Sequence, residues 1–583
     1  MNRMRSSLVA LLFLVLFGGR GIAQENHTHE HDAIRSVEEA EAFILSALSH
    51  TDYTTHTIKC LTPVLMAYEK YKNQLSPAGH EAVSFFLEQN IRSKQSNQTY
   101  ISPSGLFRLE YSTTGVNAVP ALDENTNGVP DYIEEAGIAA DFSFNRQINE
   151  LGHTNPIPDG TVYTIRFENL NGVYGFATGS GSISGPRTLF VVDNDFVGFP
   201  VNDDPDGDQL GALRVTIAHE FKHAIQFADN DWNGNSDRYA EMDATLMEEV
   251  VYDQVNDYYN YIGQNQGDLF ESPNTALPLN SNFAGSYEDI TYALFYHERF
   301  GDTFWPEVWD VIRENPSSTL FNAMDFTLSN YNSTFAEAHT EAFAWHYASG
   351  LIRSRGTFGF DESDAYPSPD ISSTLNEVNE AFVDTFVVNP VSAQYVEVIP
   401  QPDQEGTMTI ISDVDSDDSQ LGVVALLNDG TVRLEYGEYT LDSLLVVSLE
   451  QPWNSINRVG VVLVNTSTQV NDRATFSLRT SSRFITTLPG DSSLPQSISL
   501  SQNYPNPFNN STVVEVSLPS TQRITLDIYD VTGRLIQRAF DGLVSAGENQ
   551  PIRISLPNIA SGVYIYRLNT QEGSISRKLM LLK

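Results

Sequence analysis

Two histidines four residues apart in an apolar, helix-forming stretch constrain this chain more than any other feature. Residues 216–223 read Thr-Ile-Ala-His-Glu-Phe-Lys-His. Residues i and i+4 of a helix lie on one face, so the imidazoles of His219 and His223 can bind the same cation. Glu220 lies about a quarter turn away, where its carboxylate can take a proton from water. The stretch therefore predicts a metal-binding helix with a base beside it.

A second helix is expected to bring a carboxylate to the same cation. A catalytic zinc ion binds three protein ligands and a water molecule. The turn-rich residues 229–236 reverse the chain, and a helical pattern then resumes. Glu241, eighteen residues after His223, falls in the first turn of this antiparallel neighbour and is the predicted third ligand. Glu248, at i+7 on the same face, is placed to hydrogen-bond a ligand imidazole.

Other readings of the two helices remain open. Asp243, Glu248 or Glu249 could replace Glu241 as the third ligand. Alternatively, both histidines are core residues whose ring nitrogens are satisfied by neighbours, and no metal binds. The spacing, the second helix and the export signals described below favour the metal.

The order H-E-x-x-H, spacer, Glu resembles the gluzincin metallopeptidases, whose third ligand is a glutamate on a following helix. The Glu241-x6-Glu248 pair is similar to that of zinc aminopeptidase-type members, because Thr245 stands where thermolysin-like members have an aspartate. The resemblance implies an α+β zincin-like core that hydrolyses peptide bonds with zinc-activated water. It assigns the zinc ligands and the general base, which are His219, His223 and Glu241 for zinc and Glu220 for the base.

A wider resemblance covers residues 106–300, which are similar to a family of secreted bacterial metalloproteases. That family combines a calcium-type loop with His-Glu-Phe-x-His-Ala-x-Gln-Phe, here residues 219–227. Gluzincins also use a Tyr, His or Arg further along the chain to stabilise the oxyanion. The predicted donor is Tyr292, and the other candidates are Tyr287, His297 and Arg299. A packed helix residue is the alternative reading of any of these tyrosines.

A twelve-residue loop, residues 123–134, has the ligand order of a calcium-binding loop. Side-chain oxygens occupy positions 1, 3, 5, 9 and 12, glycine occupies position 6, and position 7 offers a carbonyl. The predicted calcium ligands are Asp123, Asn125, Asn127, Val129, Asp131 and Glu134. Pro130 departs from the helix-loop-helix version, so we expect a structural calcium ion in a short loop typical of extracellular proteins. Residues 203–208 are a weaker candidate, better explained as an acidic cap on the histidine helix.

The single cysteine, Cys60, excludes an intrachain disulfide. It lies in the region most like a propeptide. Its thiolate could occupy the open zinc position and keep the enzyme latent until the segment is cut away. A small buried hydrophobic residue is the alternative reading. We therefore hypothesise that Cys60 inhibits the enzyme by binding the zinc ion, and we call this a cysteine latch.

Both ends of the chain carry export signals. Residues 1–23 combine Arg3 and Arg5 with a ten-residue apolar run and a small-residue cleavage site, as signal peptides do. Residues 498–583 contain Asn-Tyr-Pro-Asn-Pro-Phe-Asn, Ile-Tyr-Asp-Val-Thr-Gly-Arg and a basic, apolar end. They closely resemble the C-terminal sorting domain of the type IX secretion system. This resemblance implies recognition by an outer-membrane translocon and a secreted or cell-surface product.

Charge divides the chain and excludes some partners. The formal net charge is −42, whereas residues 498–583 hold eight Lys and Arg against six Asp and Glu. So acidic a surface repels nucleic acid and anionic lipid, and no segment after the signal peptide is apolar enough to span a membrane. The expected parts are a signal peptide (1–23), a helical propeptide-like region (24–100), a zincin-like metallopeptidase domain (101–385), a β-sandwich (386–483), a linker (484–497) and a β-sandwich for sorting (498–583).

Together these patterns predict a secreted zinc metalloendopeptidase that acts on a protein or peptide substrate. An extended substrate would pair with the sheet edge that precedes the histidine helix, at residues 171–177 or 188–192. Two alternatives stay open. One is a cell-surface adhesin or binding protein with a non-catalytic metal site. The other is an exopeptidase or a hydrolase of glycan-linked substrates.

Overall fold

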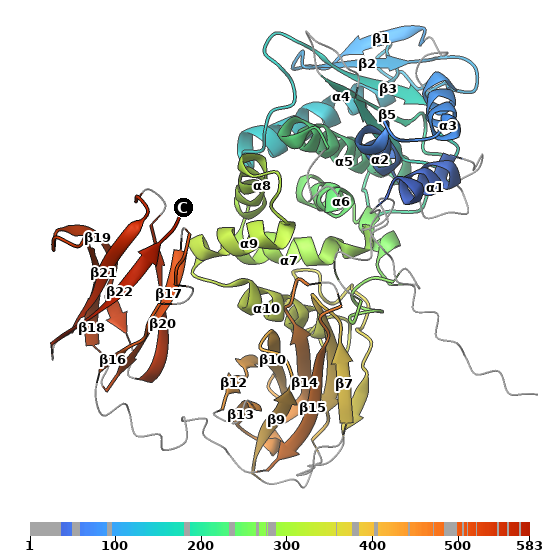
Figure 1. Cartoon of the computed structure of the whole chain (residues 1–583). Helices are drawn as coiled ribbons and strands as arrows, with labels where there is room; N and C mark the ends of the chain where they lie inside the picture. Colours follow the sequence, from blue (N-terminus) through green and yellow to red (C-terminus); the bar gives the residue numbers. More distant parts are fainter. Residues whose placement is uncertain are drawn as a thin grey trace, which may run out of the picture. The chain divides into compact units, whose positions relative to one another are not determined.

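The computed structural model describes residues 36–48, 59–89, 96–179, 187–232, 239–263, 267–275, 277, 287–356, 358–375, 384–400, 406–440, 444–469, 471–482, 498–503, 506–509, 511–519, 522–544, 547–556, 559–570 and 573–583. The predicted signal peptide (1–23) and linker (484–497) lie outside the described residues. The chain is multidomain, with mixed helices and several β-sheets followed by all-β structure, as predicted (Figure 1). By internal contacts it divides into two compact units, residues 1–437 with 451–482, and residues 438–450 with 483–583.

Three helices form the N-terminal region of the first unit. They are α1 (Val37–Leu48), α2 (Thr62–Tyr71) and α3 (Pro77–Leu87). The α1 helix buries Ala40, Ile44 and Ala47, which recur at helical spacing on one face. Ser76 caps the N-terminus of α3, and its hydroxyl accepts a hydrogen bond from the Ala78 amide. Within the range predicted to be helical (24–100), the described part forms these three helices, which pack on one another, while α2 also packs on β4 (Gly175–Gly179) of the sheet described next. Strand β1 begins at Gln98, and residues 24–35, 49–58 and 90–95 lie outside the described residues.

A five-stranded mixed sheet follows. Its strands are β1 (Gln98–Ile101), β2 (Phe107–Tyr111), β3 (Tyr163–Glu168), β4 (Gly175–Gly179) and β5 (Thr188–Asp193). The order is β1-β2-β3-β5-β4. The three central strands run parallel, whereas β4 pairs antiparallel with β5 and forms one edge of the sheet.

Helices pack against this sheet and extend beyond it. The long helix α5 (Asp208–Asn230) packs on β4 and β5, beside α4 (Asp131–Phe144) with its continuation η2 (Asn145–Glu150), and α6 (Ala240–Val251) packs on α5. The later helices and turns are η4 (Asp257–Tyr261), η5 (Tyr287–Asp289), α7 (Ile290–Phe300), α8 (Phe304–Glu314), α9 (Leu320–Leu328), η6 (Ser329–Tyr331) and α10 (Phe335–Tyr347). None of the helices described is long and apolar enough to cross a bilayer.

Two further sheets follow α10, as the alternating strands predict. Their strands are β6 (Ser373–Leu375), β7 (Asp384–Val388), β8 (Ser392–Val398), β9 (Thr407–Val414), β10 (Ser419–Leu427), β11 (Val432–Tyr436), β14 (Ile456–Asn465) and β15 (Ala474–Ser481), with the hairpin β12 (Glu438–Tyr439) and β13 (Leu444–Pro452). One sheet has the order β11-β10-β14-β8-β6, and in the other β15 pairs with β9 and β7. The α10 helix packs on β10 and β14, so the helical region and this sheet share one core.

The C-terminal module is a small sandwich with its own core. It contains β16 (Ser499–Leu500), β17 (Ser511–Leu518), β18 (Gln522–Tyr529), β19 (Leu535–Val544), β20 (Gly547–Ser555), β21 (Gly562–Asn569) and β22 (Ser574–Leu581). One sheet has the order β16-β17-β20 and the other β19-β18-β21-β22. Alternating residues such as Val514, Val516, Ile524 and Leu526 point inward and form the core between the sheets.

Candidate metal centre

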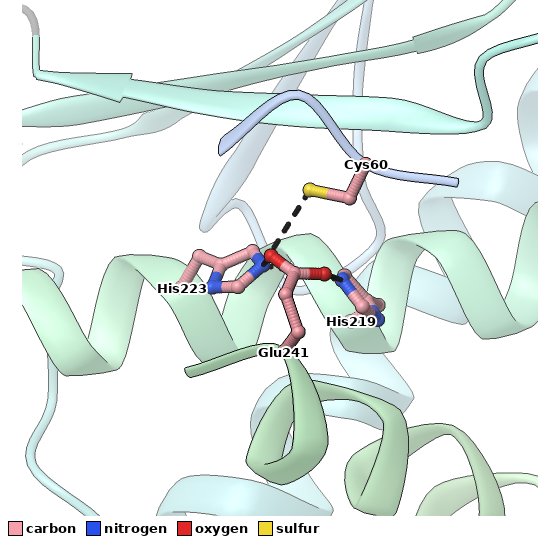
Figure 2. A group of neighbouring side chains, drawn as sticks. All are labelled: Cys60, His219, His223 and Glu241. Atoms are coloured by element: carbon pink, nitrogen blue, oxygen red, sulfur yellow. Dashed lines mark hydrogen bonds and ion pairs between the residues drawn. The ribbon is translucent and has the colours of Figure 1, made fainter. Parts of the chain in front are cut away.

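Two imidazole side chains in the middle of α5 point toward the same position. His219 and His223 lie one helical turn apart, both fully buried, and their Nε2 atoms are 3.1 Å apart. Figure 2 shows the two rings projecting from the same face of this helix. Two ring nitrogens this close cannot both carry a proton toward each other, so the arrangement suits a shared cation.

Glu241, on the neighbouring helix α6, brings a carboxylate to the two imidazoles. It lies in the first turn of α6, where the helix begins next to the histidine face of α5. Its Oε2 lies 3.2 Å from His219 Nε2, and its Oε1 lies 3.0 Å from His223 Nε2. Figure 2 shows the carboxylate between the two rings. The structure thus brings the three predicted zinc ligands together.

The fourth donor is Cys60, which comes from the loop before α2. Its Sγ lies 3.5 Å from His223 Nε2 and the side chain is buried. One donor atom from each of Cys60, His219, His223 and Glu241 lies within 4.8 Å of the others. Among the described residues, this group could hold a metal ion, and two nitrogens, one oxygen and one sulfur are donors that zinc accepts.

Hydrogen bonds behind the ligands fix their orientation. His219 Nδ1 donates to Glu248 Oε1 at 2.7 Å, which is the contact predicted for Glu248. His223 Nδ1 donates to Gln226 Oε1 at 2.8 Å, and the Gln226 amide in turn donates to Asp243 Oδ2 at 2.9 Å. Each imidazole therefore directs its Nε2 lone pair toward the centre. Asp243, a candidate ligand by sequence, supports Gln226 instead.

The charges of the group stabilise a cation at its centre. Burial opposes a charge on His219, but hydrogen bonds to Glu241 and Glu248 outweigh it and raise the pKa of the imidazole to about 10. Burial also opposes a charge on Glu241, but the two imidazoles outweigh it and lower the pKa of its carboxyl to about 2. Positive charge between these carboxylates is therefore favoured, as metal binding requires.

Glu220 lies beside the group without belonging to it. Its Oε2 accepts a hydrogen bond from the Thr62 hydroxyl at 3.1 Å, while Oε1 is buried and has no hydrogen-bond partner among the described residues. Burial raises the pKa of Glu220. A Cβ on Gly175 would lie 2.9 Å from the Val191 carbonyl and 3.0 Å from Glu220 Oε1, so glycine lets β4 pass close to this carboxylate.

The segment that carries Cys60, residues 59–62, covers the edge strand and is called the strap below. The Tyr174 amide donates to the Lys59 carbonyl at 2.9 Å, and the Leu61 amide donates to the Gly175 carbonyl at 3.2 Å. Cys60 pairs with Gly175 in a parallel bridge. Residues 171–177, predicted to bind an extended substrate, include the start of the edge strand β4 and hydrogen-bond to the chain's own strap. The alternative, residues 188–192, belongs to β5, which lies inside the sheet.

The structure does not bring Tyr292 to this group. Its hydroxyl hydrogen-bonds with His339 Nδ1 at 2.8 Å and with the Tyr296 hydroxyl at 3.1 Å, because this face of α7 is turned toward α10. Tyr287, in the turn just before α7, is the hydroxyl that reaches the site. It accepts a hydrogen bond from the Cys60 amide at 3.0 Å, and its ring lies 6.3 Å from that of His219.

The predicted calcium loop is compact and exposed. Glu134 accepts hydrogen bonds from the side-chain amides of Asn125 and Asn127, at 2.7 and 2.8 Å. Asp123 accepts from the Asn127 and Gly128 amides, and Asp131 from the Glu124 amide. These hydrogen bonds hold Asp123, Asp131 and Glu134 to other residues of the same loop. In the acidic loop 203–208, Asp204 and Asp206 pair with Arg214 of α5.

Three residues at the site were not predicted from sequence. Thr62 bridges the Glu220 carboxylate and the Ala177 amide, Gln226 orients His223, and Lys59 pairs with acids described below. The sequence did contain an indication of the role of Gln226, because this residue lies three positions after His223 on the same helix face and can hydrogen-bond to it. Thr62 and Lys59 carry no such signal, because their partners are distant in sequence.

Comparison with known proteins identifies the C-terminal module. Residues 502–582 match the family described as the secretion system C-terminal sorting domain. The protein is therefore secreted or on the cell surface, which confirms the predicted type IX export. No curated protein sequence matches the chain.

Similar solved structures cover only part of the chain. Dimeric latent PorU from Porphyromonas gingivalis is 17% identical with a TM-score of 0.13, over 35% of this chain and 20% of that one. The BSP domain of a biofilm-associated protein is 9% identical with a TM-score of 0.12, over 36% and 53%. A β-1,2-glucanase from Parabacteroides distasonis is 12% identical with a TM-score of 0.12, over 33% of each chain. The chain spans less than two thirds of the length of each of these proteins.

Replacing Glu248 by Gln should weaken metal binding without removing a ligand. The amide cannot accept from His219 as strongly as the carboxylate does, so the affinity for zinc should fall about 10- to 100-fold. Titration of the metal-free full chain with zinc against a competing chelator measures this change.

Glu249→Gln is the matched control. Burial and the charge of Glu362 raise the pKa of Glu249 to about 10, so glutamine resembles its neutral form. Equal zinc affinity of Glu248→Gln and the parent chain would contradict the assigned role of Glu248.

Proposed function

We propose that this protein is a secreted, latent zinc metallopeptidase with Glu220 as its general base. The observation that carries the proposal is the position of Glu220, buried beside His219, His223 and Glu241 but outside their donor set. A site that only held a metal would not need a second carboxylate, Glu220, buried next to the ligand carboxylate of Glu241 but outside the donor set. The residues fit zinc because their nitrogen, oxygen and sulfur donors converge within one small volume.

The surrounding architecture supports the same reading. The two imidazoles come from one helix, α5, packed on a mixed sheet whose edge strand β4 is antiparallel to its neighbour. The carboxylate comes from the next helix, α6. This is the arrangement expected from the resemblance to gluzincin metallopeptidases and their zincin-like core.

Different side chains of the protein would then carry out different steps of peptide hydrolysis. Zinc, when bound, supplies a polarised carbonyl and a more acidic water molecule. Glu220 takes a proton from that water and delivers it to the leaving amine, and its raised pKa suits a group that holds the proton between the two transfers. Tyr287, in place of Tyr292, offers the hydroxyl nearest the ligands for the oxyanion. An extended peptide would pair with β4 in place of the strap.

Cys60 keeps this machinery latent. Burial, with the charges of Glu220 and Glu241, raises the pKa of its thiol well above the usual value. A bound cation reverses that balance and favours the thiolate as a fourth ligand. The strap meanwhile covers the edge strand, and the Thr62 hydroxyl occupies one oxygen of Glu220. The strap therefore blocks the open metal position with Cys60, the base Glu220 with Thr62, and the edge strand β4 with its backbone.

A second reading draws on the same four donors. A closed set of four buried protein ligands is typical of structural zinc sites, which favours a cell-surface adhesin or binding protein with a non-catalytic metal. The two functions differ in the role of Cys60. In a structural site Cys60 remains a metal ligand permanently, whereas in a latent enzyme it leaves the metal when the strap is removed.

We also propose that the loop 123–134 binds a structural calcium ion. Asp123 and Glu134, at the two ends of the loop, accept hydrogen bonds from amides of the residues between them, and the order of oxygen donors along the loop is that of a calcium-binding loop. Calcium should raise the thermal unfolding midpoint of the full chain, and Asp123→Ala should remove the increase. An increase of equal size in the variant would contradict this site.

Glu220→Gln should abolish peptide cleavage while zinc stays bound. Glutamine keeps the size of the side chain but cannot accept a proton, so the rate should fall by about 100-fold or more. Digestion of a peptide library by the processed protein, with zinc content measured on the same sample, tests this. Full cleavage by the variant would refute the role of Glu220, and no cleavage by the parent would favour the adhesin.

Cys60→Ser should give cleavage by the unprocessed full chain. Serine binds zinc far more weakly than a thiolate, so the fourth position opens. In the cobalt-substituted protein, the thiolate-to-cobalt absorption band should disappear in the variant. Adding Glu220→Gln to Cys60→Ser is the control and should remove the new activity. If Cys60→Ser stays as latent as the parent, the latch hypothesis is wrong.

A further inference from the structure

Lys59, the first residue of the strap, is a buried cation held by two acids. Its side chain is only 1% exposed, and Nζ lies 2.6 Å from both Glu248 Oε2 and Asp257 Oδ2. The ammonium also lies over the rings of Tyr174 and Tyr261, 4.6 and 4.7 Å from their centroids. Two carboxylates and two aromatic faces therefore surround a single ammonium group.

The groups that hold Lys59 belong to the body of the protein. Glu248 lies on α6, Asp257 and Tyr261 lie on η4, and Tyr174 directly precedes β4. Lys59 belongs to the strap, which the proposed activation withdraws. Its departure leaves two carboxylates without their cation, which is costly for buried groups. The structure is thus built to take up another cation at this position.

This cation site adjoins the metal ligands. Glu248 accepts from His219 Nδ1 with Oε1 and from the Lys59 ammonium with Oε2. Lys59 is also the neighbour in sequence of Cys60, whose sulfur lies among the ligands. A peptide that replaced the strap on β4 would therefore place a side chain here within about two residues of the bond to be cut.

We propose that Glu248, Asp257, Tyr174 and Tyr261 form a specificity site for a lysine or arginine side chain of the substrate, and that Lys59 fills it in the latent chain. This inference rests on the proposed peptidase function and names its substrate class. Asp257 is the specificity-determining residue, because Glu248 also orients His219 whereas Asp257 contacts Lys59 and the Tyr174 hydroxyl. The aromatic faces favour an ammonium or guanidinium group over a hydrated metal ion.

The first test asks whether the site accepts an external cation. In the full chain with Lys59→Ala, propylammonium replaces the missing part of the lysine side chain and should raise the thermal unfolding midpoint. 1-Propanol is the neutral control, and Lys59→Ala/Asp257→Asn is the control variant. Neither control should show the increase. An equal increase with propanol, or none with propylammonium, would overturn the inference.

The second test measures substrate preference. The Lys59→Ala/Cys60→Ser full chain should cleave peptides with Lys or Arg near the scissile bond at least about tenfold faster than the same peptides with norleucine. Adding Asp257→Asn should remove this preference. If Lys59→Ala does not fold, the processed parent protein and its Asp257→Asn variant are compared in the same way.

The outcomes separate this inference from the proposed function. Cleavage without preference for a basic residue overturns the specificity site and leaves the peptidase intact. No cleavage of any peptide by the processed parent protein, together with a propylammonium effect in the Lys59→Ala chain, overturns the peptidase and supports the cation site alone.

Discussion

The contact of one carboxylate with two imidazoles determines the rest of the site. Glu241 reaches His219 and His223 only because α6 begins beside the middle of α5. The same placement brings Glu248 to the back of His219 and Asp243 to Gln226. The two helices are therefore joined by polar contacts inside an apolar interface, where each unmade hydrogen bond is costly. The position of α6 sets the geometry of the ligands and of their supports together.

Glu248 links the candidate metal ligands to the strap. One of its oxygens accepts from His219 and the other from Lys59, so the orientation of a ligand and the anchoring of the strap depend on one side chain. The strap also contacts β4 through its backbone and Glu220 through Thr62. Latency, as proposed, thus rests on several weak contacts and one metal bond. Withdrawal of the strap, as proposed, would change the surroundings of His219, Glu220 and β4 together.

Local helical geometry explains which parts of the site could be predicted. The spacings of His219, His223, Glu241 and Glu248 are helix spacings, and the structure brings all four side chains together. Tyr287 could not be chosen over Tyr292, because that choice depends on how α7 faces α10. The pairing of Lys59 with Asp257 joins residues 198 apart in sequence. Likewise, strand patterns predicted the sheets after α10, but not that α10 shares their core.

The burial of Cys60 also bears on the environment into which the protein is exported. Secreted and surface proteins meet oxidising conditions, in which an exposed thiol is soon lost to disulfides or sulfenic acid. The only thiol of this chain lies on the strap and is buried against His223 of α5, and burial with the nearby charges of Glu220 and Glu241 raises the pKa of the thiol, which keeps it in the less reactive protonated form. The burial of Cys60 would thus protect the thiol of the proposed latch from oxidation during and after export.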